Sequence, residues 1–444
     1  MTEEIKDIPI IIEERESKNA GASESYWQIV RKQFKKNKLA VWSLRIIMLF
    51  AVIALLSDFI ANERPLMCTY QGNTYFPVFK GIAVDWGLGE WQDEFKNITW
   101  KDLEYESVIW PPVPYLPQNL DVLNSNSVSP MDDQEVESTR WKHWLGTDEI
   151  GRDVLSGMIH GTKTALLVGL ISMGIAALIG ILMGSLAGYF GDDKLKMTIA
   201  SIILNVLALF FGIFYGFGNR SYTLGEAMAE GMGAVAVELV ISFTIIIVLL
   251  LLANLFAKVL SNIPLLSKKV TIPLDIIISR LIEIMVSVPT LFLIISISAT
   301  VEKPSVAIVM VIIGLTSWTG IARFMRAELL RIRRLEYVEA AKALGYNELR
   351  TIVKHAIPNA LSPVLIAIAF GIAAAILIEA TLSFIGIGMP AEEITWGSML
   401  AMSRQTPSAW WLAIFPGLAI FITVTVYNLV GEGLTDAIDP KQKK

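Results

Sequence analysis

The sequence contains very few of the residues that build metal sites and disulfides. Among 444 residues there is one cysteine, Cys68, and there are three histidines, His143, His160 and His355. A single thiol excludes an intrachain disulfide and a cysteine-rich metal site. The histidines lie far apart in the sequence, and none belongs to an H-E-x-x-H pattern. The sequence therefore predicts neither a metal site nor the catalytic groups of an enzyme.

Charged residues are also scarce. They make up 18% of the chain, against roughly 25% in an average soluble domain, while 54% of the residues are hydrophobic. The apolar residues gather in long runs, which is typical of an integral membrane protein. The first 25 residues are polar and acidic. We therefore expect the first apolar run, from about Leu39, to be a signal-anchor span rather than a cleaved leader.

A phosphate-binding loop of the form G-x-x-x-x-G-K-[ST] is absent from the sequence. The nearest match is HGTKT at residues 160–164, where Thr162 separates the glycine from the lysine. The chain therefore has no recognisable ATP-hydrolysing site, and we expect no cofactor in it.

Eight apolar runs are long enough to cross a bilayer, for which about 20 residues are needed. The second run contains Gly180, Gly184 and Gly188 at a spacing of four, which favours close approach of another helix. The sequence thus predicts an all-α integral membrane protein with eight spans. The runs lie at about 39–60, 164–190, 197–217, 233–258, 276–299, 305–322, 361–385 and 410–431.

Basic residues orient the spans. One cluster directly precedes the first span, a second follows the sixth, and a third ends the chain. With eight spans, all three clusters fall on the same side, which the positive-inside rule makes cytoplasmic. Both termini are then expected in the cytoplasm. The clusters are Arg31, Lys32, Lys35, Lys36 and Lys38; Arg323, Arg326, Arg331, Arg333, Arg334, Lys342, Arg350 and Lys354; and Lys441, Lys443 and Lys444.

The segment 62–146 is then extracytoplasmic. It holds 13 acidic and six basic residues and is rich in tryptophan. So many indole rings predict a small ordered subdomain or a cap on the membrane surface, and they favour packing and interface anchoring over ligand binding. The tryptophans are Trp86, Trp91, Trp100, Trp110, Trp141 and Trp144.

The stretch EYVEAAKALGYNELRTIVKHAIPNA, residues 336–360, is charged although it lies between two apolar spans. Glu336 suits the start of a helix, and Gly345 suits its end. Asn347 is a typical cap for a second helix, which we expect Pro358 to break before the next span. The pattern predicts two short helices joined at a glycine.

The pair Ala340-Ala341 gives the first of these helices a thin face, which would let another protein surface approach its backbone closely. An ordinary alanine-rich loop helix is the alternative, because alanine favours helix. The spacing E-A-A-x-x-x-G, with a proline 13 residues beyond the glycine, resembles the EAA motif of ATP-binding-cassette (ABC) importer permeases. In that family the segment is the coupling helix that docks on a cytoplasmic ATPase. The matching residues implied to couple are Glu339, Ala340, Ala341, Leu344, Gly345 and Pro358.

Further segments resemble the oligopeptide (dipeptide) permease C branch of that family. They are HWLGTDEIGRDVLSGMIHGTKTAL at 143–166, EATLSFIGIG at 379–388 and GEGLTDAIDP at 431–440. The first-span region and the following YQGNTYFPVFK resemble a subgroup with a long insert, which includes importers of peptides and of microcin C-like peptide-nucleotides. The family signature before the second span comprises Gly146, Thr147, Asp148, Gly151, Arg152 and Asp153.

The role of this signature is open on sequence alone. Asp148, Arg152 and Asp153 could contact a docked binding protein. The alternative is that Thr147 or Asp148 caps a short interfacial helix whose apolar side, with Ile150, Val154 and Met158, faces lipid.

The resemblance implies a type I ABC importer permease core of six spans that moves peptides inward. It implies a homologous B-type permease, one or two ATPase subunits that use ATP and Mg²⁺, and an extracytoplasmic peptide-binding protein as partners, in a bacterial inner membrane. Lipid is the remaining partner, and nucleic acid is not expected. The cargo itself is left open between peptides, peptide-like antibiotics and nickel.

The chain departs from the family pattern at 191–270, where two extra apolar runs flank GNRSYTLGEAMAEGM. We expect a peripheral helical hairpin that faces lipid, outside the six-span core. The expected organisation is a cytoplasmic tail (1–38), a first span (39–61), the extracytoplasmic insert (62–146), an interfacial helix and second span (147–190), the hairpin (191–270), the core spans (271–432) with coupling helices at 323–358, and a cytoplasmic tail (433–444).

Charges inside apolar runs test the alternative of an ion-gradient-driven secondary transporter, which needs buried ionisable residues or broken helices in both halves. Few such residues exist. Glu238 lies in the hairpin, and Arg280 and Glu283 are spaced to pair with each other near the start of the fifth span, close to Asp275. Glu379, within the seventh span, can line a translocation cavity or hydrogen-bond a neighbouring helix.

Overall fold

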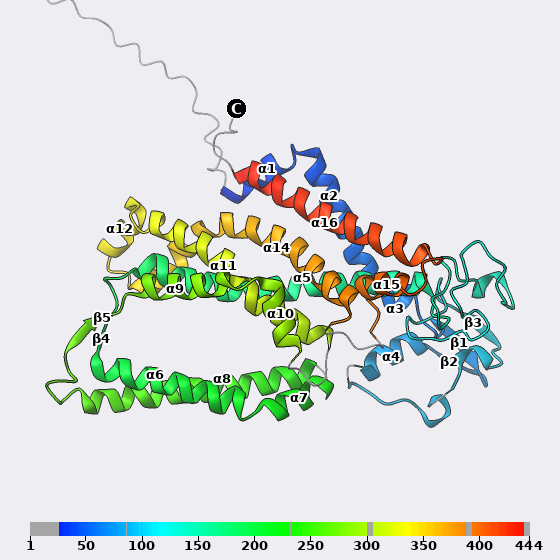
Figure 1. The fold of residues 1–444 in the computed structure, drawn as a ribbon, viewed down its shortest axis with the longest axis horizontal. Helices are drawn as coiled ribbons and strands as arrows, with labels where there is room; N and C mark the ends of the chain where they lie inside the picture. Colours follow the sequence, from blue (N-terminus) through cyan, green and yellow to red (C-terminus); the bar gives the residue numbers. More distant parts are fainter. Residues whose placement is uncertain are drawn as a thin grey trace, which may run out of the picture.

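The long helices run side by side in an elongated molecule (Figure 1). The insert lies at one end, called the insert end below, and α12 lies at the opposite end, called the α12 end. The tryptophan at position 86, the three terminal lysines and the glycine that ends the 379–388 match fall outside the described residues. The computed structural model describes residues 26–85, 87–96, 98–230, 232–299, 305–387 and 393–438.

Within the described residues, seven helices are long and apolar enough to cross a membrane, and a bent pair, α9 with α10, makes an eighth crossing if it counts as one span. This agrees with the eight spans expected from the sequence. The helices are α1 (Tyr26–Phe34), α2 (Lys38–Leu55), α3 (Ser57–Ile60), α4 (Pro77–Asp85), α5 (Val154–Ser185), α6 (Ile199–Ile213), α7 (Ser221–Glu230), α8 (Met232–Leu260), α9 (Leu274–Ser287), α10 (Thr290–Ser298), α11 (Val306–Ile332), α12 (Glu336–Ala343), α13 (Glu348–Thr351), α14 (Ile357–Ile385), α15 (Trp396–Ser403) and α16 (Trp411–Ile438).

Helices α5 and α11 form the centre of the bundle and approach each other through glycines. A Cβ atom on Gly184 would lie 2.6 Å from the carbonyl oxygen of Ala322, and one on Gly188 would lie 2.6 Å from that of Arg326. Contacts this short are possible only without a side chain, so the predicted close packing at the four-residue spacing is confirmed. Helices α14, α16 and α2 pack around this pair.

The fifth span is not the continuous helix that the apolar run 276–299 suggested. Helices α9 and α10 meet at an angle of 80°. The break falls at Val288-Pro289, where Val288 has the extended backbone angles φ −94° and ψ 125°. A proline disfavours the helical conformation of the residue before it and cannot donate the next helical hydrogen bond, and these two effects account for the bend.

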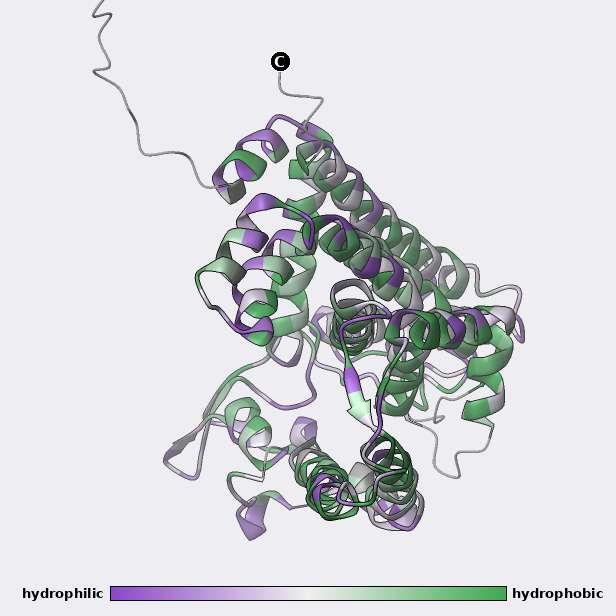
Figure 2. Ribbon diagram, turned by 90° about the vertical axis from the view of Figure 1, so that its left-hand side faces the viewer, coloured by the Kyte–Doolittle hydropathy of each residue, from purple (hydrophilic) through white to green (hydrophobic). Residues whose placement is uncertain are grey.

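The segment 191–270 folds as a hairpin of α6 and α8, apart from the main bundle (Figures 1 and 2). The side-chain amides of Asn205 and Asn254 join the two helices by reciprocal 3.1 Å hydrogen bonds. Arg220 and Glu238 form an ion pair near α7, which connects the helices. The antiparallel strands β4 (Lys196–Thr198) and β5 (Lys269–Thr271) close the base of the hairpin.

The insert is an ordered subdomain around a three-stranded antiparallel sheet of order β2-β1-β3. Aromatic rings fill the space beside this sheet: Phe95 and Trp100 are buried and stack with centroids 5.3 Å apart. The insert therefore has a hydrophobic core of its own. Its strands are β1 (Met67–Tyr70), β2 (Asn73–Tyr75) and β3 (Ser107–Ile109), and short 3₁₀ turns lie at Asp93–Phe95, Trp100–Asp102 and Thr139–Trp141.

Candidate functional site

The helix–glycine–helix segment forms as the sequence predicted. Helix α12 ends before Gly345, which has φ +83°, a left-handed conformation that side chains oppose. Asn347 then caps α13, and its Oδ1 accepts a hydrogen bond from the backbone N–H of Arg350 at 2.7 Å. The two short helices thus turn sharply at the α12 end of the molecule (Figure 1).

The second short helix does not stop before the next span, contrary to the prediction from Pro358. Helix α13 continues through a π-turn, Ile352–Ala356, directly into α14. The whole run Glu348–Ile385 counts as one helix of 38 residues. Pro358 lies in the first turn of α14. Proline has no N–H to donate, but the π-turn just before it shifts the hydrogen-bond register, so that the helix continues without a donor at this position.

The exposed surface of this segment is more apolar than the two alanines suggested. Ala340 is exposed, but Ala341 is only 6% exposed and packs inward, so the two alanines do not form one shared face. Leu344 and Leu349 are 77% and 70% exposed. The side chains of Tyr337 and Val353 are exposed too, and these four apolar residues of a charged segment are together called the docking patch below.

A polar contact joins the segment that carries the docking patch to the bundle. The buried Tyr189, in the π-turn Leu186–Phe190 that ends α5, donates its hydroxyl to the carboxylate of Glu348. The ring of Tyr346 stacks on His355 with centroids 5.8 Å apart, and the guanidinium of Arg350 lies 4.6 Å from the same ring. The segment is therefore held to the end of α5 by Glu348, stabilised internally by Tyr346, Arg350 and His355, and continuous with α14.

The signature at 146–153 forms a buried turn at the insert end. The Asp148 carboxylate accepts a hydrogen bond from the backbone N–H of Arg152 at 2.8 Å and pairs with its guanidinium at 2.6 Å. Gly146 and Gly151 have φ +79° and +86°, and a Cβ on Gly151 would lie 2.0 Å from the carbonyl oxygen of Asp121. The glycines are required by backbone conformation and space.

The prediction of a short interfacial helix capped by Thr147 or Asp148 is wrong. Asp153 is the cap instead, with its Oδ1 accepting from the N–H of Ser156 at 2.6 Å, and the helix it begins is α5 itself. Val154 is buried rather than turned to lipid. The carbonyl oxygen of Thr147 accepts a hydrogen bond from the Trp411 indole at 3.0 Å, so tertiary contacts replace a helix here.

His143 joins the insert to this turn, a role that the sequence did not indicate. Its Nδ1 lies 2.8 Å from Asp153 Oδ2 and its Nε2 lies 3.1 Å from Asp121 Oδ2. The ring is fully buried under Tyr115, with centroids 4.4 Å apart. Burial alone would lower the pKa of His143, but the hydrogen bonds and charges of the two carboxylates raise it above its ordinary value.

Charges within the spans are mostly paired. Arg326 Nη2 lies 2.8 Å from Asp275 Oδ2, and Arg280 pairs with Glu283 at 2.6 Å, as their spacing indicated. Glu379 is only 2% exposed and accepts a 2.7 Å hydrogen bond from Ser383 on its own helix. The burial of Glu379 and its bond to Ser383 favour a role in helix packing over a role in lining the translocation cavity.

Two family models match the chain. The model for the binding-protein-dependent transport system inner membrane component covers residues 266–444, which contain the docking patch. The model for the N-terminal TM domain of oligopeptide transport permease C covers residues 25–75.

Proteins with similar sequences are described as permeases of transport systems. The peptidoglycan transport system permease protein YejE of Agrobacterium fabrum is 26% identical over an alignment of 443 residues, which covers 94% of this chain and 92% of that protein. The inner membrane ABC transporter permease protein YejE of Escherichia coli is 26% identical over 422 residues, 92% of this chain and 96% of that protein. The dipeptide transport system permease protein DppC of Bacillus subtilis is 27% identical over 304 residues, 68% and 70% of the two chains.

The helical architecture and these matches define the chain as a permease subunit of a binding-protein-dependent ABC transport system, a multi-pass protein of the inner membrane. Within that class, its similarity is to the oligopeptide permease C type, whose N-terminal transmembrane domain model matches residues 25–75. This assignment favours an ABC permease over an ion-gradient-driven transporter.

Proposed function

We propose that this chain forms one half of the membrane pathway of an ABC importer that carries peptides or peptide-like compounds into the cytoplasm. A homologous B-type permease supplies the other half. One or two types of ATPase subunit bind at the α12 end and hydrolyse ATP with Mg²⁺. An extracytoplasmic binding protein delivers cargo at the insert end, and the α12 end and both termini face the cytoplasm.

The docking patch is the observation that carries this proposal. Leucine side chains exposed to water lose the favourable free energy of burial. They regain it when another protein surface covers them. The family matches make an ATPase the natural partner. The names of similar proteins, which include peptidoglycan and dipeptide transport systems, support peptide-like cargo.

An ion-gradient-driven carrier is the competing function. The bend between α9 and α10 is the kind of broken helix that such carriers use, but within the described residues only one bent pair of this kind occurs. A carrier of that class also has no use for an apolar docking patch.

The test is uptake of a labelled peptide by the permeases and ATPases, reconstituted in vesicles with their binding protein. We expect uptake to require ATP and to persist when an uncoupler dissipates ion gradients. The double variant Leu344→Asp/Leu349→Asp places two charges in the patch, and it should lower uptake and peptide-stimulated ATP hydrolysis at least about tenfold.

The matched control is Val122→Asp, which adds a charge at a side chain of similar exposure, 78%, in the insert. It should insert and transport normally. Uptake that ignores ATP but stops with the uncoupler would establish the competing function, and normal coupling in the double variant would remove the docking role of the patch.

A further inference from the structure

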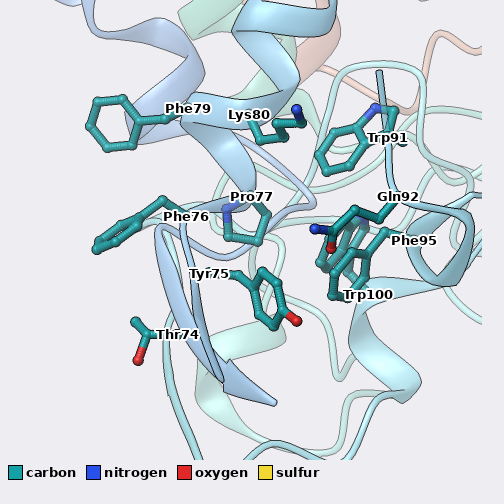
Figure 3. A pocket seen from close by; sticks show the side chains of 10 residues that line it. All are labelled: Thr74, Tyr75, Phe76, Pro77, Phe79, Lys80, Trp91, Gln92, Phe95 and Trp100. Atoms are coloured by element: carbon teal, nitrogen blue, oxygen red, sulfur yellow. The ribbon is translucent and has the colours of Figure 1, made fainter. Parts of the chain in front are cut away.

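The insert contains an open cavity of about 410 Å³ beside β2 and α4. Its volume falls within the range of roughly 300–1,000 Å³ that is usual for small-molecule sites. Figure 3 shows the side chains around it. The lining residues come from β2, α4 and the following 3₁₀ turns: Thr74, Tyr75, Phe76, Pro77, Phe79, Lys80, Trp91, Gln92, Phe95 and Trp100.

Aromatic rings form most of the cavity wall. Phe95 packs against Tyr75 with centroids 4.9 Å apart and stacks on Trp100, so the floor of the cavity is fixed by the core of the insert. Phe76 and Phe79 stand at its edge, 52% and 57% exposed. A rigid floor with exposed rings at the edge suits an apolar or aromatic side chain, whose burial would cover these rings.

The polar groups of the cavity favour a negative charge. Lys80 and the Gln92 amide are present, and none of the described residues that line the cavity carries a carboxylate. Among the described residues, no acidic side chain forms an ion pair with Lys80. The surrounding segment 62–146 has 13 acidic and six basic residues. An ammonium group without an acidic partner, in a segment so rich in acids, is placed to meet an external anion.

The edge of the sheet adds a third feature. Strand β2 pairs with β1 on one side, and its other side is an outer edge of the three-stranded sheet. Thr74 and Tyr75 of this strand line the cavity. A free strand edge can bond the backbone of an extended peptide, and side-chain pockets beside it then select the sequence.

We propose that this cavity binds the C-terminal end of a short peptide, with the last side chain, apolar or aromatic, among the rings and the terminal carboxylate at Lys80. The inference rests on the proposed function, because it makes the peptide cargo the ligand. The peptide backbone lies along the outer edge of β2, and Gln92 can bond its last amide. The insert is thus a cargo-selecting site ahead of the membrane pathway.

The test uses the complete permease–ATPase complex, without nucleotide or binding protein, and two fluorescent tripeptides: Ala-Ala-Phe and its C-terminal amide. We expect saturable binding, with the free acid bound about tenfold more tightly than the amide, because the amide loses the charge-assisted contact. Lys80→Gln should remove this difference, and Trp91→Ala should weaken both peptides.

The control is Lys101→Gln. Lys101 also belongs to the insert, but its ammonium lies over the ring of Trp141 at 4.8 Å, outside this cavity. It should leave both affinities unchanged. The proposal would be overturned if the unaltered complex bound the acid and the amide equally. It would also be overturned if the two lysine variants had equal effects, or if the peptides bound only to the lipid of the vesicles and not to the complex.

ATP-dependent uptake by the same preparation separates the two levels of inference. If uptake is normal while the cavity binds no peptide, the site is refuted and the transport function stands. If uptake itself fails to depend on ATP, the proposed function fails first.

Discussion

The His143 ring lies between the carboxylates of Asp121 and Asp153, and thereby joins the insert to the first turn of α5. A buried ion pair stabilises little by itself, but removal of one member leaves an uncompensated charge that is strongly destabilising. The two carboxylates beside the imidazole favour its protonated form in the folded state.

Stability at the insert end should therefore depend on pH. Because the pKa of His143 is raised in the folded chain, the protonated ring contributes stability that is fully present below its unfolded value of about 6.5 and is lost as pH rises through the folded value. We expect the melting temperature of the insert, followed by tryptophan fluorescence, to fall as the pH rises above about 6.5.

The variant His143→Gln should melt lower at the acidic end and lose most of this pH dependence. Asp133→Asn, at an exposed acid of the insert, is the control and should keep it. An unchanged alkaline decline in His143→Gln would show that another group is responsible.

At the scale of elements, the α5–α11 contact depends on glycine. In Gly184→Ala the new methyl group meets the Ala322 carbonyl oxygen at 2.6 Å and the Met325 Cβ at 2.7 Å. Overpacking of this kind costs about 1–3 kcal/mol. Thermal unfolding in detergent should show the loss. Gly174→Ala, in the same helix with no atom within 4 Å of the new Cβ, should be neutral, and equal effects of the two changes would refute the packing argument.

The α6–α8 hairpin should be removable. Thr198 and Lys269 are paired across β4 and β5, so a two-residue Asn-Gly turn can join them once residues 199–268 are deleted. Since α6 and α8 pack chiefly on each other, the melting midpoint of the remaining chain should stay within about 2–4 °C. Aggregation or loss of the cooperative transition would show that the hairpin is part of the core.

Local patterns predicted much of this architecture, and the exceptions have physical causes. The glycine spacing in α5 and the cap at Asn347 depend on neighbours in sequence, and both were predicted. The bend at Pro289 was not predicted, although the sequence contains the signal for it: a proline inside an apolar run disfavours a continuous helix. The inward direction of Ala341 and the partners of His143 were not predictable, because they depend on segments distant in the chain.

At the scale of the whole molecule, the proposed orientation can be tested by cysteine labelling. The native thiol, Cys68, is buried in β1, and Cys68→Ala provides the background. Tyr222 in α7 and Leu265 in the loop before β5 are exposed at opposite ends of the hairpin. An impermeant maleimide added outside right-side-out vesicles should label Tyr222→Cys but neither Leu265→Cys nor Leu344→Cys. Labelling of Leu265→Cys from outside would contradict eight crossings.

The unbroken helix from Glu348 to Ile385 has a mechanical consequence. Its 38 residues extend over roughly 57 Å at 1.5 Å per residue, which is longer than a bilayer's hydrocarbon core. Its far end lies tightly against α15, where a Cβ on Gly397 would lie 2.6 Å from the Ala380 carbonyl oxygen. A displacement of Leu349 is therefore carried along one continuous helix toward the opposite side of the membrane. The π-turn at Ile352–Ala356 is the first place along this helix where bending can absorb part of the displacement.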